Sequence, residues 1–250
     1  MVARTQLVDY LEELLDVRSF SDACPNGLQV EGADEIENLV SGVTANLALI
    51  ERAEKQGADA ILVHHGYFWK GENPVVVGMK QRRLKRLLAA NINLLAYHLP
   101  LDAHPVYGNN AQLASLLGFR IMGSFAGSPP IGMWGRLPAP MEAQAFAMML
   151  AERLNRPPFS ILAGPAEIEN VAWCSGAAHS YLEEAVRMGV DAFVTGEVSE
   201  PTVHTARECG IHFFAAGHHA TERYGVKALG DHLASRFGLE HHFIDIDSPV

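Results

Sequence analysis

The sequence contains one kind of segment twice, and this repeat limits the folds that the chain can adopt. AEKQGADAILVHHG (53–66) and AVRMGVDAFVTGEV (185–198) share a helix end, a glycine, an Asp-Ala step and an apolar strand. Two further pairs follow in the same order, namely 91–102 with 210–222 and 113–119 with 233–239. Three matching blocks in one order indicate the duplication of a β-α-β-α-β unit.

The alternation of helical and short apolar segments predicts an α/β fold of two related halves with mostly parallel sheets. The first half is expected over residues 1–125 and the second over 126–250, with the repeat itself spanning about 36–122 and 168–246. The expected strands are 38–43, 59–63, 91–97, 171–174, 191–195, 211–216 and 242–246.

The segment between the two repeats belongs to the second half in this interpretation. Residues 131–165 are expected to form a strand, a helix and a second strand. Residues 123–130, GSFAGSPP, contain glycine and proline and are expected to be the connection between the halves.

Polar residues follow the predicted strands at matching points in both halves. They are His64 and His65, His98, Glu197, and His218 with His219. Ligands of open parallel sheets bind in the crevice beyond the carboxyl ends of the strands. A buried core histidine would explain one such residue, but not a pair together with two more. We therefore expect His64 and His65 to leave the strand and converge on one site or on two adjacent ions.

Two spacings favour metal binding over acid–base chemistry alone. His218 and Glu222 are four residues apart and would lie on one helix face, where two side chains can bind one ion. His98 and Asp102 have the same separation, but Pro100 between them indicates a turn entering a helix. A lone His-x-x-x-Glu pair is more often a surface salt bridge, and the histidines at the strand ends reverse that preference. Imidazole and carboxylate ligands without thiolates suit Zn, Mn, Fe, Co or Ni.

Blocks along nearly the whole chain resemble the YbgI-like, or Nif-three-like, family, whose members are described as GTP cyclohydrolase I type 2. The blocks are PNGLQVEG (25–32), VHHGYFWKG (63–71), YHLPLDAHP (97–105), GNNAQLA (108–114), VDAFVTGE (190–197) and AAGHHATER (215–223). The resemblance implies a dinuclear metal centre in a crevice between the halves, and a homohexamer with the centres facing an interior cavity. It places the metal ligands on His64, His65, Asp102, His218 and Glu222, with the glutamate serving both ions.

Two residues near these ligands are candidates for catalysis. His98 is expected either as a ligand or as a residue behind the ligands. Glu197 aligns with His65 in the repeat, which makes it a candidate acid, base or partner of a ligand. His104 and His204 are expected nearby, and His219 as an outer group. Asn26 and Gly27 after Pro25 predict a simple turn, and Phe68 and Trp69 are expected to pack on their own domain rather than stack on a planar ligand.

The leading hypothesis is a two-metal hydrolase, because a pair of ions can activate water at neutral pH. The resemblance implies hydrolytic opening of the GTP purine ring with release of formate. An anionic triphosphate would require positive groups, and the candidates are Lys70, Arg82, Arg83 and Arg223. The alternative hypothesis is a metal-binding scaffold or regulator that acts through a protein partner without catalysis.

Composition and motifs exclude several other classes. A formal net charge of -10 argues against sequence-independent nucleic-acid binding, and the basic run KQRRLKR (80–86) predicts a solvated helix face. Cys24, Cys174 and Cys209 lack any C-x-x-C pairing, so neither a disulfide framework nor a thiolate zinc site is expected. No segment has the unbroken apolar length of a membrane span. We therefore expect a cytoplasmic protein. No phosphate loop, dinucleotide fingerprint or nucleophile elbow occurs.

Overall fold

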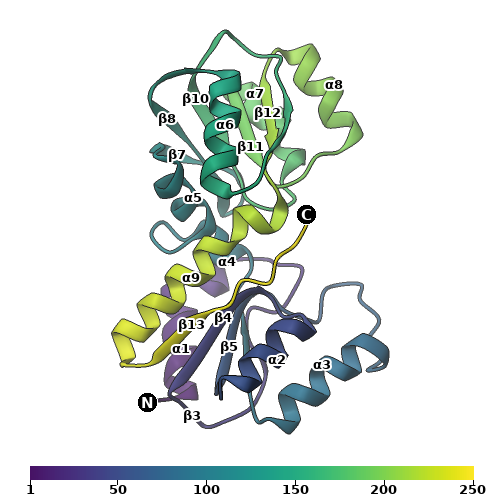
Figure 1. The fold of residues 1–250 in the computed structure, drawn as a ribbon, viewed down its shortest axis with the longest axis vertical. Helices are drawn as coiled ribbons and strands as arrows, with labels where there is room; N and C mark the ends of the chain where they lie inside the picture. Colours follow the sequence, from purple (N-terminus) through teal and green to yellow (C-terminus); the bar gives the residue numbers. More distant parts are fainter. The chain divides into compact units, whose positions relative to one another are not determined.

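The computed structural model describes residues 1–250, and the chain forms two compact units (Figure 1). Unit 1 comprises Met1–Gly108 and Gly225–Ile246, and unit 2 comprises Asn109–Tyr224 and Asp247–Val250. This partition differs from the sequence halves 1–125 and 126–250. Helix α9 (His218–Phe237) begins in unit 2, but its residues Val226, Leu229 and Leu233 are buried in the core of unit 1.

Unit 1 is built on a five-stranded sheet with the order β13-β4-β5-β6-β2. Three adjacent strands, β4 (Asn38–Thr44), β5 (Ala60–His65) and β6 (Asn93–Ala96), run parallel in chain order. Strand β13 (Glu240–Phe243) pairs with β4 in parallel, and β2 (Gly27–Val30) pairs with β6 antiparallel. A separate two-stranded ribbon joins β1 (Val2–Ala3) to β3 (Glu35–Ile36).

Helices cover both faces of the unit 1 sheet, because successive strand residues point to opposite faces and both sets are apolar. Helix α1 (Arg4–Leu14) and residues of α9 pack on the face that carries Leu39 and Leu62. Helices α2 (Leu47–Lys55) and α3 (Gly78–Ala89) pack on the opposite face, with Ile61. The solvated helix face predicted at residues 80–86 is present in part, because Arg82, Lys85 and Arg86 are exposed but Lys80 and Arg83 are partly buried.

Unit 2 contains a six-stranded sheet with the order β7-β8-β10-β11-β12-β9. Strands β10 (Glu167–Trp173), β11 (Ala192–Thr195) and β12 (His212–Ala215) are parallel. The expected strand, helix and strand over 131–165 are present as β8 (Pro130–Glu142), α6 (Ala143–Leu154) and β9 (Phe159–Ile161).

The prediction of a connection at 123–130 was wrong. Strand β7 (Arg120–Gly127) forms an antiparallel hairpin with β8, and Ser128 and Pro129 make the turn. Glycines at residues 123 and 127 weaken the strand pattern of the sequence, whereas pairing along β8 satisfies the backbone groups of the segment.

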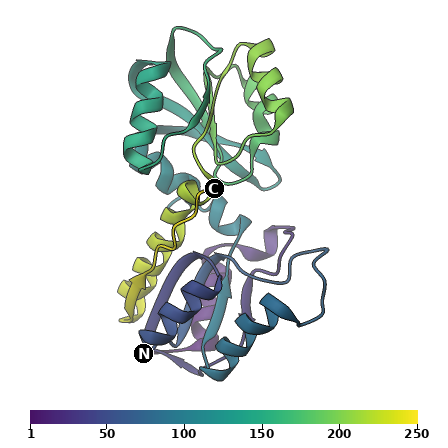
Figure 2. The same cartoon turned by 45° about the vertical axis from the view of Figure 1, so that its right-hand side comes forward.

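Helices also cover both faces of the unit 2 sheet, as Figure 2 shows for α6 and α8. Helix α5 (Asn109–Leu117) and α6 pack with Trp173 and Val194. Helices α7 (Leu182–Met188) and α8 (Glu200–Cys209) pack on the other face, with Phe193. Unit 1 and unit 2 therefore share a three-layer plan in which three parallel strands occur in chain order.

A series of polar side chains, buried at Ser41 and exposed at Asp231, joins three elements of unit 1. The His241 Nδ1–H donates to Asp231 Oδ1 at 2.8 Å, and the Ser41 hydroxyl hydrogen-bonds with His241 Nε2 at 2.7 Å. This is the order of groups found in serine hydrolases. Ser41 is 0 % exposed in the middle of β4, so no substrate reaches its hydroxyl. The series instead fastens α9 to β13 and β4.

The cysteines and the helices were both subjects of sequence expectations. All three cysteines are free thiols, with Cys24 and Cys174 buried and Cys209 exposed. None of the helices combines the length and the apolar character that crossing a membrane requires.

Candidate metal centre

His64 and His65 are the last two residues of β5 in unit 1. The expectation that they leave the strand was wrong, because the pairing of Thr44 with His65 extends the β4–β5 ladder to the end of β5. His64 is fully buried and His65 is partly exposed. Their imidazole centroids are nevertheless only 4.6 Å apart, so both rings lie at the carboxyl end of the sheet.

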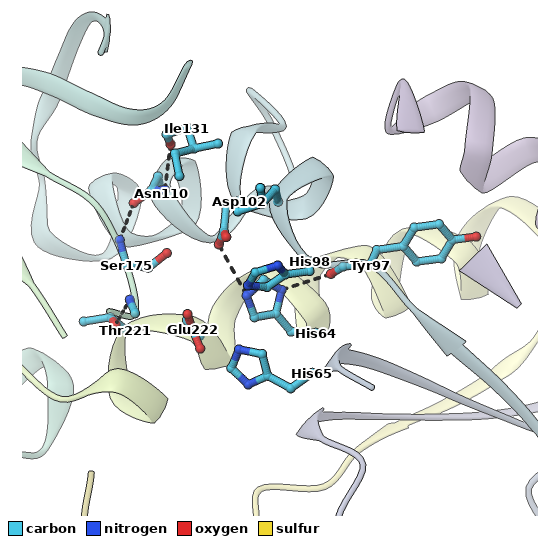
Figure 3. Close-up of polar contacts among 12 residues, drawn as sticks. His64, His65, Tyr97, His98, Asp102, Asn110, Ile131, Ser175, Thr221 and Glu222 are labelled. Atoms are coloured by element: carbon cyan, nitrogen blue, oxygen red, sulfur yellow. Dashed lines mark hydrogen bonds and ion pairs between the residues drawn. The ribbon is translucent and has the colours of Figure 1, made fainter. Parts of the chain in front are cut away.

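Hydrogen bonding defines which nitrogen of His64 carries a proton. His64 Nδ1 lies 2.9 Å from the carbonyl oxygen of Tyr97, which can only accept, so Nδ1–H is the donor (Figure 3). In the neutral ring, the lone pair of Nε2 then faces Asp102 Oδ1 at 3.5 Å. Two electron-rich atoms in this arrangement favour a proton or a cation between them.

His98 immediately precedes the short helix α4 (Leu99–Ala103), as expected for a turn entering a helix, whereas Asp102 lies inside that helix. The backbone N–H of Asp102 donates to the carbonyl oxygen of His98 at 3.1 Å. The His98 ring centroid is 5.0 Å from that of His64 and 5.7 Å from that of His65. The three histidines offer ligand atoms within 4.8 Å of one another, which makes them a candidate metal-binding group within unit 1.

The segment 22–29 holds the backbone and side chains of this group, a role that the sequence interpretation missed. Asp22 accepts a 2.8 Å hydrogen bond from His98 Nδ1, and Asn26 Oδ1 accepts one from the His98 backbone N–H at 2.7 Å. Gln29 donates to the Tyr67 carbonyl and accepts from the Tyr67 N–H, which fixes the chain just after the two histidines. The structure does not form the predicted turn at Asn26 and Gly27, because Gly27 begins β2; this segment instead fixes the backbone that follows β5 and β6.

Trp69 packs against the histidines of unit 1. Its ring centroid lies 5.1 Å from that of His98 in an edge-on arrangement and 6.0 Å from that of His65. The Trp69 indole N–H donates to the carbonyl oxygen of Gly66 at 3.3 Å. Trp69 therefore packs on its own unit, as expected, and it does so directly beside the candidate ligands. Phe68 is 39 % exposed.

His218 and Glu222 lie in the first turns of α9, within unit 2, with the predicted four-residue spacing. His218 Nδ1–H donates to Glu197 Oε1 at 2.6 Å, and Nε2 lies 3.1 Å from Glu222 Oε2. Burial lowers the pKa of His218, but the two glutamates outweigh it and raise this pKa to about 9. A site that holds a proton this firmly favours positive charge, as a cation-binding site does.

Glu222 is 3 % exposed and lies close against the backbone of Gly176. A methyl group added at Gly176 would clash with Glu222 Oε1. Gly176 has φ +67°, a conformation that other residues rarely adopt. The Ser-Gly pair at 175–176 therefore makes room for the carboxylate, and the sequence carries no local signal of this role.

The remaining candidates have separate interactions. Arg223 donates to the carbonyl oxygen of Leu154 at 2.5 Å, and the Arg83 guanidinium lies over the Tyr67 ring. His104 stacks on Tyr107, whose hydroxyl hydrogen-bonds with His232. The exposed His204 contacts Glu200, and Arg82 is also exposed. The backbone N–H of His219 donates to the Val250 carbonyl, and that of Lys70 donates to the Ala23 carbonyl.

The chemistry of the donors fits a divalent transition metal. The groups gathered in each unit are imidazoles and carboxylates, the ligands that Zn, Mn, Fe, Co and Ni accept. Cys24 lies beside Asp22 and His98, but burial and the charge of Asp22 raise the pKa of its thiol to about 12. Burial and the neighbouring carboxylate therefore disfavour the thiolate form of Cys24.

The fold and donor groups define a two-unit α/β protein with histidine- and carboxylate-rich strand ends. The family model for Duf34/NIF3 (NGG1p interacting factor 3) matches residues 2–249, and the chain belongs to this family. A relative from Pseudomonas aeruginosa, named GTP cyclohydrolase 1 type 2 homolog, is 55% identical over 251 residues and covers 100% of this chain and 99% of its own.

Solved structures agree with this membership. The structure of the protein ybgI has a TM-score of 0.97 and 51% sequence identity, with 100% of both chains covered. The crystal structure of a Thermus thermophilus protein, TTHA1606, has a TM-score of 0.91 and 36% identity, again over 100% of both chains. The family predicted from the sequence blocks and the α/β fold with mostly parallel sheets are confirmed.

Proposed function

We propose that this protein is a metal-dependent hydrolase with a dinuclear centre of divalent ions. The observation that carries the proposal is a matching arrangement in each unit. One imidazole nitrogen donates a hydrogen bond that orients the ring, and the other nitrogen faces a carboxylate, at 3.5 Å for His64 and Asp102 and at 3.1 Å for His218 and Glu222. Oriented imidazoles of this kind are typical of metal ligands.

In this proposal His64, His65, Asp102, His218 and Glu222 are the metal ligands, and Glu222 serves both ions. A pair of divalent ions supplies Lewis acidity and activates water for hydrolysis at neutral pH. Glu197 orients His218 through the 2.6 Å hydrogen bond to Nδ1. His98, held by Asp22, presents its other nitrogen to the site as a proton acceptor.

The proposed substrate is a purine nucleoside triphosphate, with GTP as the first candidate. Support comes from relatives at 55% and 52% identity that are named GTP cyclohydrolase 1 type 2 homolog. In such a reaction water opens the purine ring and formate is released. We also propose a homohexamer, on the basis of the family resemblance of the sequence blocks.

The test uses full-length protein stripped of metal by a chelator and then loaded with Zn, Mn, Fe, Co or Ni separately. Formate release from GTP and ATP, and phosphate release from simple phosphoesters, are measured for each form. We expect turnover with at least one ion, and loss of it on chelation. The matched control is His64→Ala, which should lose turnover under the same loading. Metal binding without turnover on any of these compounds would contradict the hydrolase and favour a metal-binding scaffold.

A further inference from the structure

We propose that Asp22 is a positioning residue that fixes His98 in the tautomer with its proton on Nδ1, so that Nε2 can accept a proton in the reaction at the metal centre. This inference rests on the proposed function and assigns a role to a residue outside the predicted ligand set. Asp22 and His98 are 76 positions apart in the sequence and meet through a 2.8 Å hydrogen bond within unit 1.

The hydrogen-bond partners of Asp22 are all donors. Oδ1 accepts from the backbone N–H of Ala23 at 2.6 Å and from His98 Nδ1 at 2.8 Å. Oδ2 accepts from the Asn26 side-chain amide and from the Leu99 backbone N–H, each at 3.0 Å. Four donors converge on one carboxylate whose side chain is 3 % exposed. A carboxylate has acceptor sites only, so each of its four partners presents a hydrogen.

This arrangement leaves His98 one orientation and one tautomer. A second bond, from the His98 backbone N–H to Asn26 Oδ1 at 2.7 Å, fixes the start of α4, and Asn26 in turn donates to Asp22. Turning the ring would break its bond to Asp22, while the backbone bond to Asn26 holds the base of the side chain in place. With Nδ1–H directed at Asp22, Nε2 is the nitrogen that carries the lone pair.

One ring nitrogen of His98 lies among the other candidate ligands of unit 1, and because Nδ1–H is bonded to Asp22, Nε2 is the nitrogen that can accept a proton there. The ligand atoms of His64, His65 and His98 lie within 4.8 Å of one another, and Trp69 packs edge-on against the His98 ring at 5.1 Å. Some histidine general bases have this arrangement. A carboxylate accepts a hydrogen bond from one imidazole nitrogen and fixes the ring, and the other nitrogen accepts the proton in the reaction.

The substitution Asp22→Asn tests this mechanism because it changes shape little but replaces one acceptor oxygen by an NH₂ donor. If the NH₂ group faces His98, it also opposes the Ala23 N–H, and the His98 proton must move from Nδ1 to Nε2, so the acceptor at Nε2 is lost. If the NH₂ group faces the other side, it meets the Asn26 amide and the Leu99 N–H, so two donors oppose it. Neither orientation of the new amide preserves all four contacts. We expect the orientation with the NH₂ group toward His98 to dominate.

The direct measurement is the protonation of His98 by magic-angle-spinning NMR of metal-free protein labelled with ¹⁵N-histidine. The His98 signals are assigned by their loss in His98→Gln. Wild-type protein should show a protonated Nδ1 and an unprotonated Nε2, and Asp22→Asn should show the proton on Nε2. The matched control is Asp9→Asn, an exposed carboxylate of unit 1, which should leave the His98 signals unchanged.

The second measurement separates positioning from metal binding. In metal-loaded Asp22→Asn, kcat should fall by about 10²- to 10⁴-fold, while the metal content per chain stays at the wild-type value. A wild-type His98 with its proton on Nε2 overturns the proposal even if Asp22→Asn fails to fold. An unchanged tautomer in a folded Asp22→Asn also overturns it. Absence of turnover in the wild type would contradict the proposed hydrolase and leave the tautomer result standing.

Discussion

Asp59 and Asp191 accept the same pair of backbone hydrogen bonds in unit 1 and unit 2. Asp59 Oδ2 lies 2.9 Å from the N–H groups of Glu37 and Asn38, and Asp191 Oδ2 lies 3.0 Å and 2.8 Å from those of Glu169 and Asn170. Each aspartate directly precedes the second of three parallel strands in chain order, β5 or β11. The Asp59 carboxylate therefore anchors the start of β4, whereas the Asp191 carboxylate anchors β10 just before its pairing with β11 begins at Val171.

The first prediction follows from this shared role. Asp59→Ala and Asp191→Ala should each lower the free energy of unfolding by about 1 to 3 kcal/mol, because each leaves two backbone donors without a charged acceptor. Urea unfolding followed by fluorescence would measure both. The exposed Asp9→Ala should change stability by less than about 0.5 kcal/mol. If only one of the two aspartates is destabilising, their roles differ, which would weaken the duplication that the sequence predicts.

The second prediction concerns the bridging role of Glu222. His64→Ala or His65→Ala should mainly weaken one metal site, whereas Glu222→Ala should weaken both, because it removes negative charge between two cations as well as a ligand. Metal per chain is measured by mass spectrometry after dialysis, and thermal unfolding excludes global collapse. Two tightly held ions in Glu222→Ala would contradict the bridging role. Full metal in both histidine variants would contradict the dinuclear centre itself.

The third prediction uses two glycines with nearly the same backbone conformation. Gly176 has φ +67° and Gly189 has φ +71°, but a methyl group at Gly176 would clash with Glu222 and one at Gly189 would meet nothing within 4 Å. Both alanine variants should lose about 1 kcal/mol to backbone strain. Gly176→Ala should in addition lose metal, because the carboxylate is displaced. Equal metal content in the two variants would show that Glu222 tolerates the shift.

The fourth prediction is a pH dependence of stability that arises from His241. Burial lowers the pKa of His241, and Lys227 and His242 act in the same direction, while the hydrogen bond to Asp231 only partly opposes them. The unfolded chain, with an ordinary histidine pKa of about 6.5, then binds more protons in acid than the folded chain. The contribution to stability is full above about pH 6.5 and is lost as the pH falls below it.

The measurement for His241 is the change in urea midpoint between about pH 7.5 and about pH 5.5, on either side of the ordinary histidine pKa. His241→Gln, which keeps hydrogen-bonding capacity without a titrating ring, should show a smaller loss than the wild type. His104 and His232 also have lowered pKa values and titrate in both proteins, so the difference between the two isolates His241. Equal losses in both proteins would refute the assignment.

The sequence predicted the parallel strands of both units well, because apolar runs bounded by glycine and polar residues are a local signal. It failed where pairing is decided by distant segments. Strand β7 was read as a connection because its glycines interrupt the pattern, yet β8 supplies its partner. Strand β13 was placed with the second half, although its parallel partner is β4, far earlier in the chain.

The candidate ligands were predictable because His64, His65, His98 and His218 stand at or just after the ends of strands. Asp22 was not, since it lies in a loop without periodicity and contacts His98 only through the fold. Gly176 was not either, because the absence of a side chain leaves no pattern in the sequence. Residues that position a ligand act through three-dimensional proximity, which spacing along one segment does not encode.

Helix α9 gives the chain an order of assembly. The core of unit 1 needs Val226, Leu229 and Leu233 of this helix, and its sheet needs β13. During translation, residues 1–108 therefore emerge with part of their apolar core lacking its partners until the ribosome has delivered residues 225–246. A nascent chain exposes apolar surface for as long as such partners are missing. This surface stays without its partners while residues 109–224 are synthesised, and a stop codon before residue 225 removes both β13 and the part of α9 that packs on unit 1.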